Sequence, residues 1–150
     1  MLSIQEQLLQ ACKDYVIQKL ELSNNRLMEL RKAVTSETKS TAGDKHETGR
    51  AMLHLEMEKE AQKREAIQQM KFAVNRISLA KHGERIGLGS LVETNLGMYF
   101  ISISAGQITI DEQTYYAVSI ESPIGAELLG KIPGDVLVFN GRKLQIHGVS

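Results

Sequence analysis

Two long stretches of this chain carry apolar side chains at alternating spacings of three and four residues, the heptad pattern of paired helices. The first runs from about Ser3 to Val34, with polar interruptions at Lys13 and Ser23, and the second ends near Ile77. A helix of about 31 residues is about 46 Å long. Both stripes are narrow, so neither helix suits a thick bundle. The stripe residues are Leu9, Val16, Leu20, Leu27, Leu30 and Val34 in the first stretch, and Leu53, Ile67, Met70, Val74 and Ile77 in the second.

A polar segment at residues 35–46, T-S-E-T-K-S-T-A-G-D-K-H, separates the two stripes. It carries hydroxyl groups and one glycine but no large apolar side chain, so we expect it to form a loop. Because the stripes have similar lengths and flank this single loop, they predict an antiparallel coiled-coil hairpin within one chain. A parallel coiled coil of two chains is the alternative. The hairpin prediction implies a monomer.

The composition changes near residue 82. Lys, Glu, Leu and Gln dominate before this point, whereas β-branched runs separated by glycine dominate after it. These runs predict a small antiparallel β-sheet. Ser122 as N-cap, Pro123 at the first helical position and Gly130 just past the end predict one short helix. The predicted fold class is α+β, with a hairpin at 1–82 and a β domain at 83–150. The predicted strands are 87–94, 98–104, 107–110, 114–120, 136–139 and 143–149.

Charge and cysteine content exclude several classes of function. Lys plus Arg and Asp plus Glu both total 18, and a net charge of zero argues against coating nucleic acid by charge alone. The lone Cys12 cannot form an internal disulfide, and its place beside the apolar stripe predicts a buried thiol in a reducing compartment. His54 and Glu58 share a helical face, but two ligands do not make a metal site. No stretch is long enough to cross a membrane, so we expect a cytoplasmic protein.

Two acids stand three residues apart at the predicted start of the second helix. Asp44 and Glu47 would both project from its first turn. The same D-x-x-E spacing is a capping box, in which Asp44 accepts a hydrogen bond from a backbone N–H and Glu47 reaches back. A carboxylate has more acceptor sites than a cap uses, so both interpretations hold together.

Three segments resemble the GreA/GreB transcript-cleavage factors of bacterial transcription. The residues G-D-K-H-E at 43–47 are similar to the family's G-D-x-x-E. The residues S-P-I-G-A-E-L-L-G-K-I-P-G-D at 122–135 are similar to the hallmark of its C-terminal domain, and Gly89-Ser90-Leu91-Val92 is similar to the opening of that domain. The match at 122–135 is more specific than the match at 43–47, because it fixes about ten residues in order. Its docking-motif residues are Ser122, Pro123, Ile124, Gly125, Leu129, Gly130, Gly134 and Asp135.

The resemblance implies a factor that binds RNA polymerase and is not itself an enzyme. Its hairpin tip would enter the polymerase's secondary channel and stimulate Mg-dependent cleavage of backtracked RNA by the polymerase active site. Asp44 and Glu47 would be the catalytic acids, sharing a Mg²⁺ ion with the polymerase, because neither acid binds the metal usefully alone. The sheet domain would be FKBP-like and dock at the channel rim through its motif.

The tip also departs from the family pattern. The family has a further Glu and an aromatic residue six and seven positions after the Asp, where this chain has Arg50 and Ala51. Arg50 reduces the negative charge that would attract Mg²⁺. With Lys39 and Lys45 it would contact the extruded RNA 3′ end or the polymerase; alternatively, these cations belong to a solvated loop. Polymerase binding is therefore better supported than cleavage.

Three other functions follow from the same residues. A regulator of the same shape could plug the channel without stimulating cleavage, as Arg50 suggests. The implied FKBP-like sheet alone suggests a peptidyl-prolyl isomerase, but neighbouring strand residues face opposite ways, so at most half of the aromatics could line one pocket. A non-catalytic coiled-coil adaptor is the third. The available aromatics are Tyr99, Phe100, Tyr115, Tyr116 and Phe139.

Overall fold

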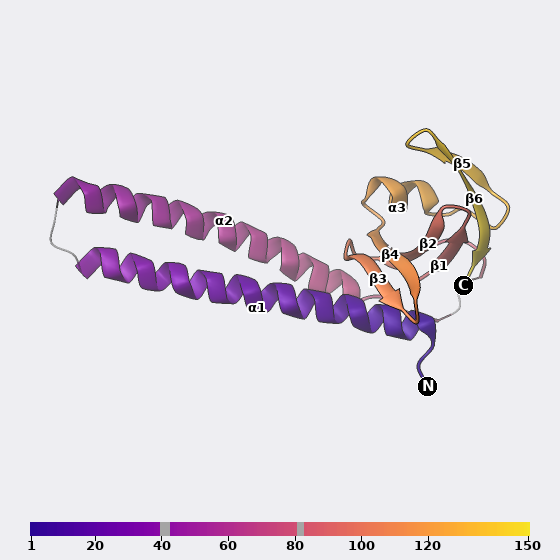
Figure 1. Ribbon diagram of the computed structural model, residues 1–150, viewed down its shortest axis with the longest axis horizontal. Helices are drawn as coiled ribbons and strands as arrows, with labels where there is room; N and C mark the ends of the chain where they lie inside the picture. Colours follow the sequence, from indigo (N-terminus) through magenta and orange to yellow (C-terminus); the bar gives the residue numbers. More distant parts are fainter. Residues whose placement is uncertain (40–42, 81–82) are drawn as a thin grey trace. The chain divides into compact units, whose positions relative to one another are not determined.

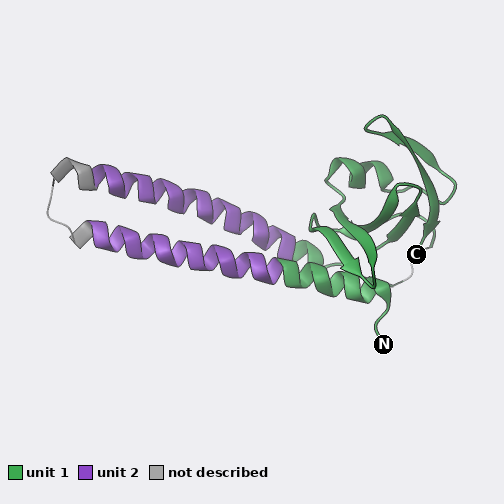
Figure 2. Cartoon of the chain, in the orientation of Figure 1, with its two compact units in different colours: residues 1–15, 72–150 green, residues 16–71 purple. Residues whose placement is uncertain are grey.

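The computed structural model describes residues 1–39, 43–80 and 83–150, and the side chains of these except 38, 39 and 43–46. Contacts divide the chain into unit 1, residues 1–15 and 72–150, and unit 2, residues 16–71 (Figure 2). None of the described helices has the length and apolarity needed to span a membrane. The elements are α1 (Ile4–Lys39), α2 (Gly43–Asn75), β1 (Leu91–Thr94), β2 (Gly97–Ser102), β3 (Gly106–Ile110), β4 (Gln113–Ser119), α3 (Pro123–Leu128), β5 (Val136–Phe139) and β6 (Arg142–Val149) (Figure 1).

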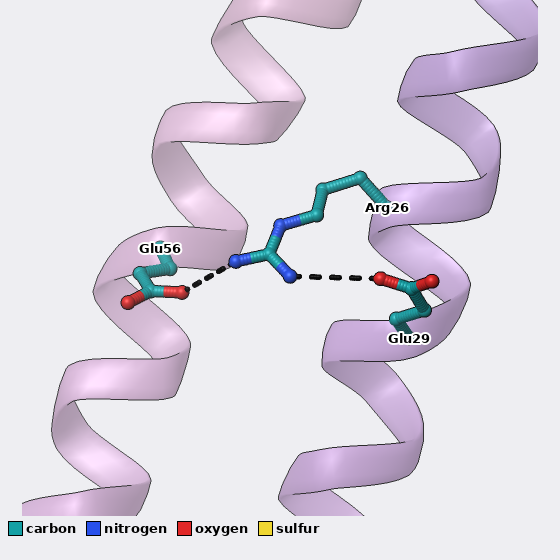
Figure 3. Close-up of polar contacts among 3 residues, drawn as sticks. All are labelled: Arg26, Glu29 and Glu56. Atoms are coloured by element: carbon teal, nitrogen blue, oxygen red, sulfur yellow. Dashed lines mark hydrogen bonds and ion pairs between the residues drawn. The ribbon is translucent and has the colours of Figure 1, made fainter.

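Unit 2 is a hairpin of two antiparallel helices, as the heptad stripes predicted. Arg64 Nε on α2 donates to Asn24 Oδ1 on α1 at 2.7 Å. Nearer the connection, Arg26 Nη2 lies 3.1 Å from Glu56 Oε2, and Arg26 Nη1 lies 3.6 Å from Glu29 Oε2 (Figure 3). As the residue number rises along α1, the number of its partner on α2 falls, so the two helices are antiparallel. The hairpin therefore forms within one chain. Its buried seam contains Val16, Ser23, Leu27, Leu30 and Ile67.

Both helices extend further into the polar segment than the sequence predicted. α1 continues through Thr35 to Lys39 and α2 begins at Gly43, so only residues 40–42 of the expected 35–46 loop lie outside the described helices. Once a helix is established, each added residue gains one backbone hydrogen bond, so polar residues propagate it readily. The Thr35 hydroxyl also donates to the Arg31 carbonyl at 3.0 Å, which satisfies that side chain within the helix.

The first residues of α1 bury a different face from the one predicted. Leu8 and Cys12 are fully buried, whereas Leu9 is only partly buried. These residues belong to unit 1, where Cys12 Sγ lies 3.5 Å from Ser102 Oγ on β2. At Cys12, contact with the sheet therefore helps to select the buried face. For the same reason the compact units divide α1 and α2 instead of separating at residue 82.

The six strands form one sheet in the order β3-β4-β2-β1-β6-β5. The predicted all-antiparallel sheet is wrong at one pair, because β2 and β4 run parallel. β3 and β4 form a hairpin whose second strand folds back beside β2, and this leaves β3 at the edge. The predicted strands leave short gaps at residues 111–113 and 140–142, and tight turns lie there: Asp111-Glu112 and Asn140-Gly141 have positive φ at both residues, as the twist of two-residue hairpins requires.

Both faces of the central strands are covered within unit 1. On one face, Leu128 of α3 packs with a cluster of sheet residues, and neighbouring side chains on β2 alternate between the two faces. Ile101 belongs to this cluster, whereas Phe100 and Ser102 are buried on the opposite face, where Cys12 of α1 lies. The sheet thus has a helix on each side. The cluster consists of Ile86, Val92, Ile101, Leu128, Leu137, Leu144 and Ile146.

Candidate functional site

The predicted acids lie at the beginning of α2. The helix starts at Gly43, so Asp44 falls inside the first turn instead of at the N-cap position that the capping box required. A carboxylate in the first turn is still favourable, because the helix dipole is positive there. The side chains of Asp44, Lys39 and Lys45 lie outside the described side chains. The geometry of the site therefore rests on Glu47 and the residues around it.

Glu47 is exposed, and the helix geometry gives the direction in which it points. Gly49 follows two residues later, about 200° around the helix. Gly49 faces α1, because a Cβ atom there would lie 3.5 Å from the Glu37 carboxylate. Glu47 consequently points away from α1. Its carboxylate is accessible to a partner.

Glu37 is a tip residue that the sequence analysis missed, because the segment was assigned to a loop. Both of its carboxylate oxygens lie within 3.5–3.6 Å of the position of a Cβ on Gly49, so the carboxylate rests flat against α2. Leu30, Val34 and Glu37 continue the four-three spacing of the α1 stripe. That continuation was the signal that could have placed Glu37 opposite α2.

Arg50 stands one turn beyond Glu47 and is partly buried. Residues three apart are neighbours on a helix surface, so its guanidinium offsets part of the negative charge of Glu47. The described part of α2 near the tip thus presents one exposed acid with one cation beside it. This is a weakly charged surface, unlike a dedicated cation site.

The tip residues fit a shared metal ion better than a metal ion of their own. Mg²⁺ is commonly held by one or two protein carboxylates, with water and substrate phosphates completing its shell. Among the residues that the structure describes, no three potential ligands come together. An exposed Glu47, one helical turn from Asp44, could supply only part of such a shell.

The docking motif begins with a helix cap that confirms the predicted α3. Ser122 has extended φ and ψ of −69° and 156°, and its Oγ accepts from Gly125 N at 3.1 Å. The same hydroxyl donates to the Ser119 carbonyl at 2.6 Å. Pro123 opens the helix, and Gly125 packs so closely that a Cβ would lie 1.8 Å from Ser119 O. These residues of the motif therefore join α3 to the end of β4.

The second part of the motif forms the turn between α3 and β5. Gly130 has a φ of 81° and its N–H donates to the Ile86 carbonyl at 2.8 Å. Gly134, with a φ of 93°, donates to the Ile146 carbonyl at 2.8 Å. Asp135 Oδ2 accepts from Ile132 N at 2.9 Å, and the Asp135 carbonyl accepts from Ile146 N. The glycines and the acid of the motif thus have structural roles.

The apolar residues of this segment are more exposed than a core would leave them. Leu129 retains 44 % of its accessible surface, and Ile132 retains 40 %. On β5, Val136 and Val138 retain 47 % and 69 %, while Leu137 between them is buried. Of these four residues, the sequence motif predicted only Leu129. For the two valines the available signal was their alternation with Leu137, because successive strand residues face opposite ways.

Cys12 is a buried structural thiol, as predicted. It has no exposed surface, and burial raises the pKa of the thiol, partly offset by the contact with Ser102. A raised pKa keeps the sulfur protonated and unreactive.

The aromatic residues divide between the faces of the sheet in the way that strand geometry predicted. Tyr99 and Tyr116 are paired across β2 and β4 with ring centroids 5.6 Å apart, while Tyr115 is buried and faces the other way. Burial raises the pKa of Tyr99, the neighbouring Tyr116 adds to this shift, and Arg142 opposes it. Tyr99 and Phe139 both pack against the core cluster. Packing therefore accounts for these rings without a proline pocket.

Comparison of the sequence with protein-family models and with curated proteins found no match. A solved structure of the transcription factor Gfh1 is similar to this chain, with 23 % sequence identity over 91 % of this chain and 92 % of that one. The TM-score of 0.37 is low. The fold described above accordingly stands on this chain's own helices and strands.

Proposed function

We propose that this chain is a Gre-type transcription factor that binds RNA polymerase in the cytoplasm as a monomer. Its hairpin tip enters the secondary channel and stimulates cleavage of backtracked RNA by the polymerase. The chain itself is not an enzyme in this proposal. The three sequence segments that resemble the family support it, one at the hairpin tip and two in the sheet domain.

The observation that carries the proposal is the direction of Glu47. An acid at the end of a two-helix hairpin contributes to another protein's active site only if its carboxylate is accessible. Glu47 is exposed and points away from α1, and Asp44 stands three residues before it on the same helix. Residues three apart lie on neighbouring positions of a helix surface, so the two acids can act together.

Asp44 and Glu47 would hold one Mg²⁺ ion jointly with the polymerase. Such an ion, when bound, stabilises negative charge on phosphate and lowers the pKa of a bound water. The role of this chain is to orient its two carboxylates at the end of a rigid helix pair and to remain bound while the polymerase acts. Arg50, with Lys39 and Lys45, would contact the RNA 3′ end or the polymerase near the acids.

The sheet domain would dock the chain through the exposed apolar residues of its motif segment. Leu129 and Ile132 lie in the α3–β5 turn, and the glycines and Asp135 fix the backbone that presents them. Exposed apolar side chains grouped on one segment are typical of a protein contact. Such a contact would cover Leu129 and Ile132, which this small domain otherwise leaves in water.

The test is a cleavage assay on a stalled polymerase complex, with Asp44→Asn and Glu47→Gln combined in one variant. Asn and Gln preserve side-chain size and helix formation but cannot hold Mg²⁺ as carboxylates do. We expect this variant to bind polymerase with unchanged affinity and to lose stimulation of cleavage. Glu21→Gln with Glu65→Gln is the matched control, because these exposed acids lie on α1 and α2 away from the tip. Undiminished cleavage by the tip variant would refute the proposal.

The second candidate is a regulator that occupies the channel without stimulating cleavage. Arg50 favours it, because this partly buried cation offsets the charge of Glu47. A channel-occupying regulator would inhibit synthesis equally well in the wild type and in the tip variant. Its effect would also be independent of the Mg²⁺ concentration, and transcripts would not be shortened.

A further inference from the structure

The two sides of the helical hairpin differ within unit 2. Asn24 and Arg26 are two residues apart and so point about 200° away from each other around α1. On the Arg26 side, an ion pair with Glu56 spans the two helices (Figure 3). On the Asn24 side there is an open groove with a volume of about 680 Å³. The groove is lined by Asn24, Leu27, Met28, Arg31, His54, Met57, Glu58, Ala61 and Arg64.

The groove residues follow a second heptad-like pattern beside the buried seam. On α1 they include positions 24, 28 and 31, and on α2 positions 54, 57, 61 and 64. These spacings of three and four residues are those with which a helix presents one continuous stripe to a neighbouring helix. In a two-helix pair such flanking positions are usually charged. Here most of the lining is uncharged, and its charged residues are Arg31, Arg64 and Glu58.

Two methionines give the groove an apolar and adaptable surface beside Glu58. Met28 retains 54 % of its accessible surface, and Met57 across the groove is partly buried. Methionine is flexible and polarisable, and it is common on surfaces that accept apolar side chains of varied shape. Ala61, with its small side chain, also lines the groove. An apolar side chain of a partner would fit this position.

The ends of the groove are cationic. Arg64 contacts Asn24, and Arg31 follows Asn24 by seven residues on α1, so the two cations are about 10 Å apart along the groove. Glu58 and His54 are the other titratable groups that line it. Two acids seven residues apart on a partner helix have the same spacing of about 10 Å. Arg31 and Arg64 outnumber the one acid of the lining, Glu58, so the charges of the groove favour an acidic helix whose acids meet the two arginines.

We propose that this groove binds an amphipathic helix of a partner protein, with an apolar residue against Met28 and Met57 and acids against Arg31 and Arg64. The bound helix then forms a local three-helix coiled coil with α1 and α2. A nucleic acid fits less well, because its phosphates call for unbroken cations and its bases for aromatic surfaces, whereas methionine and alanine occupy the centre. The proposal is independent of RNA cleavage and of the acids at the tip.

The test measures binding of a labelled synthetic helix of about 21 residues to the full chain by fluorescence anisotropy. The probe carries a leucine stripe flanked by Glu at seven-residue spacing, and a second peptide replaces each Glu with Lys. A single-stranded RNA oligonucleotide is the third probe. We expect the Glu peptide to bind at least tenfold more tightly than either of the other probes, and less tightly as salt increases.

Matched variants assign the binding to the groove. Met28→Gln removes an apolar contact with little change in size, and Met52→Gln is its control, because Met52 is similarly exposed at 61 % but does not line the groove. Arg31→Gln tests the charge contact, and Arg26→Gln on the opposite side is its control. We expect each groove variant to weaken binding at least threefold and each control to change it less than twofold.

Three results would overturn the proposal. The Glu and Lys peptides could bind equally, or the control variants could weaken binding as much as the groove variants do. The protein could also fail to bind either peptide at millimolar concentration. Tight binding of the RNA that is lost with Arg31→Gln would instead assign the groove to nucleic acid.

Discussion

Gly125 should tolerate no side chain, although it lies in a helix where alanine is normally preferred. On helix propensity alone, Gly125→Ala would stabilise the protein by about 1 kcal/mol. The structure predicts the opposite, because a Cβ at this position would lie 1.8 Å from Ser119 O and 2.9 Å from Ser122 Oγ. Relief of this overlap requires α3 to move away from the end of β4.

The expected cost follows from the contacts that such a movement disturbs. Loss of the Ser122 cap costs about 1 kcal/mol. Overpacking against a well-packed core costs about 1–3 kcal/mol, and Leu128 of α3 is fully buried in that core. After subtraction of the propensity gain, we expect Gly125→Ala to lower the free energy of unfolding of unit 1 by about 2 kcal/mol.

Gly49→Ala is the matched control, because Gly49 also lies in a helix. A Cβ there would lie 3.5 Å from the Glu37 carboxylate, an ordinary contact, so the propensity gain of about 1 kcal/mol should appear. Urea denaturation measures both effects. Tyrosine fluorescence follows unit 1, which contains all four tyrosines, and far-UV circular dichroism follows the helices of unit 2. If Gly125→Ala proves as stable as the wild type, the account of α3 packing is wrong.

Three further predictions concern stability. Ser23→Ala should stabilise unit 2 by about 1 kcal/mol in urea denaturation, because the buried Ser23 hydroxyl has no hydrogen-bond partner among the described residues; a loss of stability would contradict this. Glu112→Gly should stabilise unit 1 by about 0.5–1 kcal/mol, because its φ of 69° is strained for a residue with a Cβ, and an unchanged midpoint of tyrosine fluorescence would count against that strain. Burial raises the pKa of Cys12, so the folded state favours the protonated thiol, and the free energy of unfolding should decline as the pH rises above about 9. Cys12→Ala should flatten that decline, and equal slopes in the two proteins would assign it to other groups.

The heptad stripes predicted the hairpin because apolar spacing directly reflects which side of a helix is buried. The same stripes misplaced the first turns of α1, where Leu8 and Cys12 replace Leu9 at the buried face. Helical spacing alone cannot say whether a stripe faces a second helix or a sheet. The buried face of α1 at Cys12 depends on the contact with Ser102 on β2, which lies 90 residues further along the chain.

The sheet prediction succeeded wherever the signal was local. Asn140-Gly141 and the Ser122 cap are encoded within a few residues, and both occur as predicted. The parallel pairing of β2 with β4 was not predictable in this way, because it depends on where the β3–β4 hairpin folds back. Strand direction is a property of the whole sheet.

The candidate site was predictable in its residues but only partly in its geometry. The spacing of Asp44 and Glu47 placed both on the first turns of α2, where the structure has them. The contact of Glu37 with Gly49 joins two helices across the tip and could not be read from either segment alone. The groove lined by Met28 and Met57 likewise appears only when the two helices are paired.

The most direct measurement is the initial rate of RNA cleavage in a stalled polymerase complex as the Mg²⁺ concentration is varied. With the wild-type chain, cleavage should reach its maximal rate at a lower Mg²⁺ concentration than it does without the factor, because two added carboxylates strengthen a shared metal site. The variant combining Asp44→Asn with Glu47→Gln should bind the polymerase yet return the Mg²⁺ dependence to that of the polymerase alone. Identical curves for the wild type and this variant would contradict a role for these acids in cleavage.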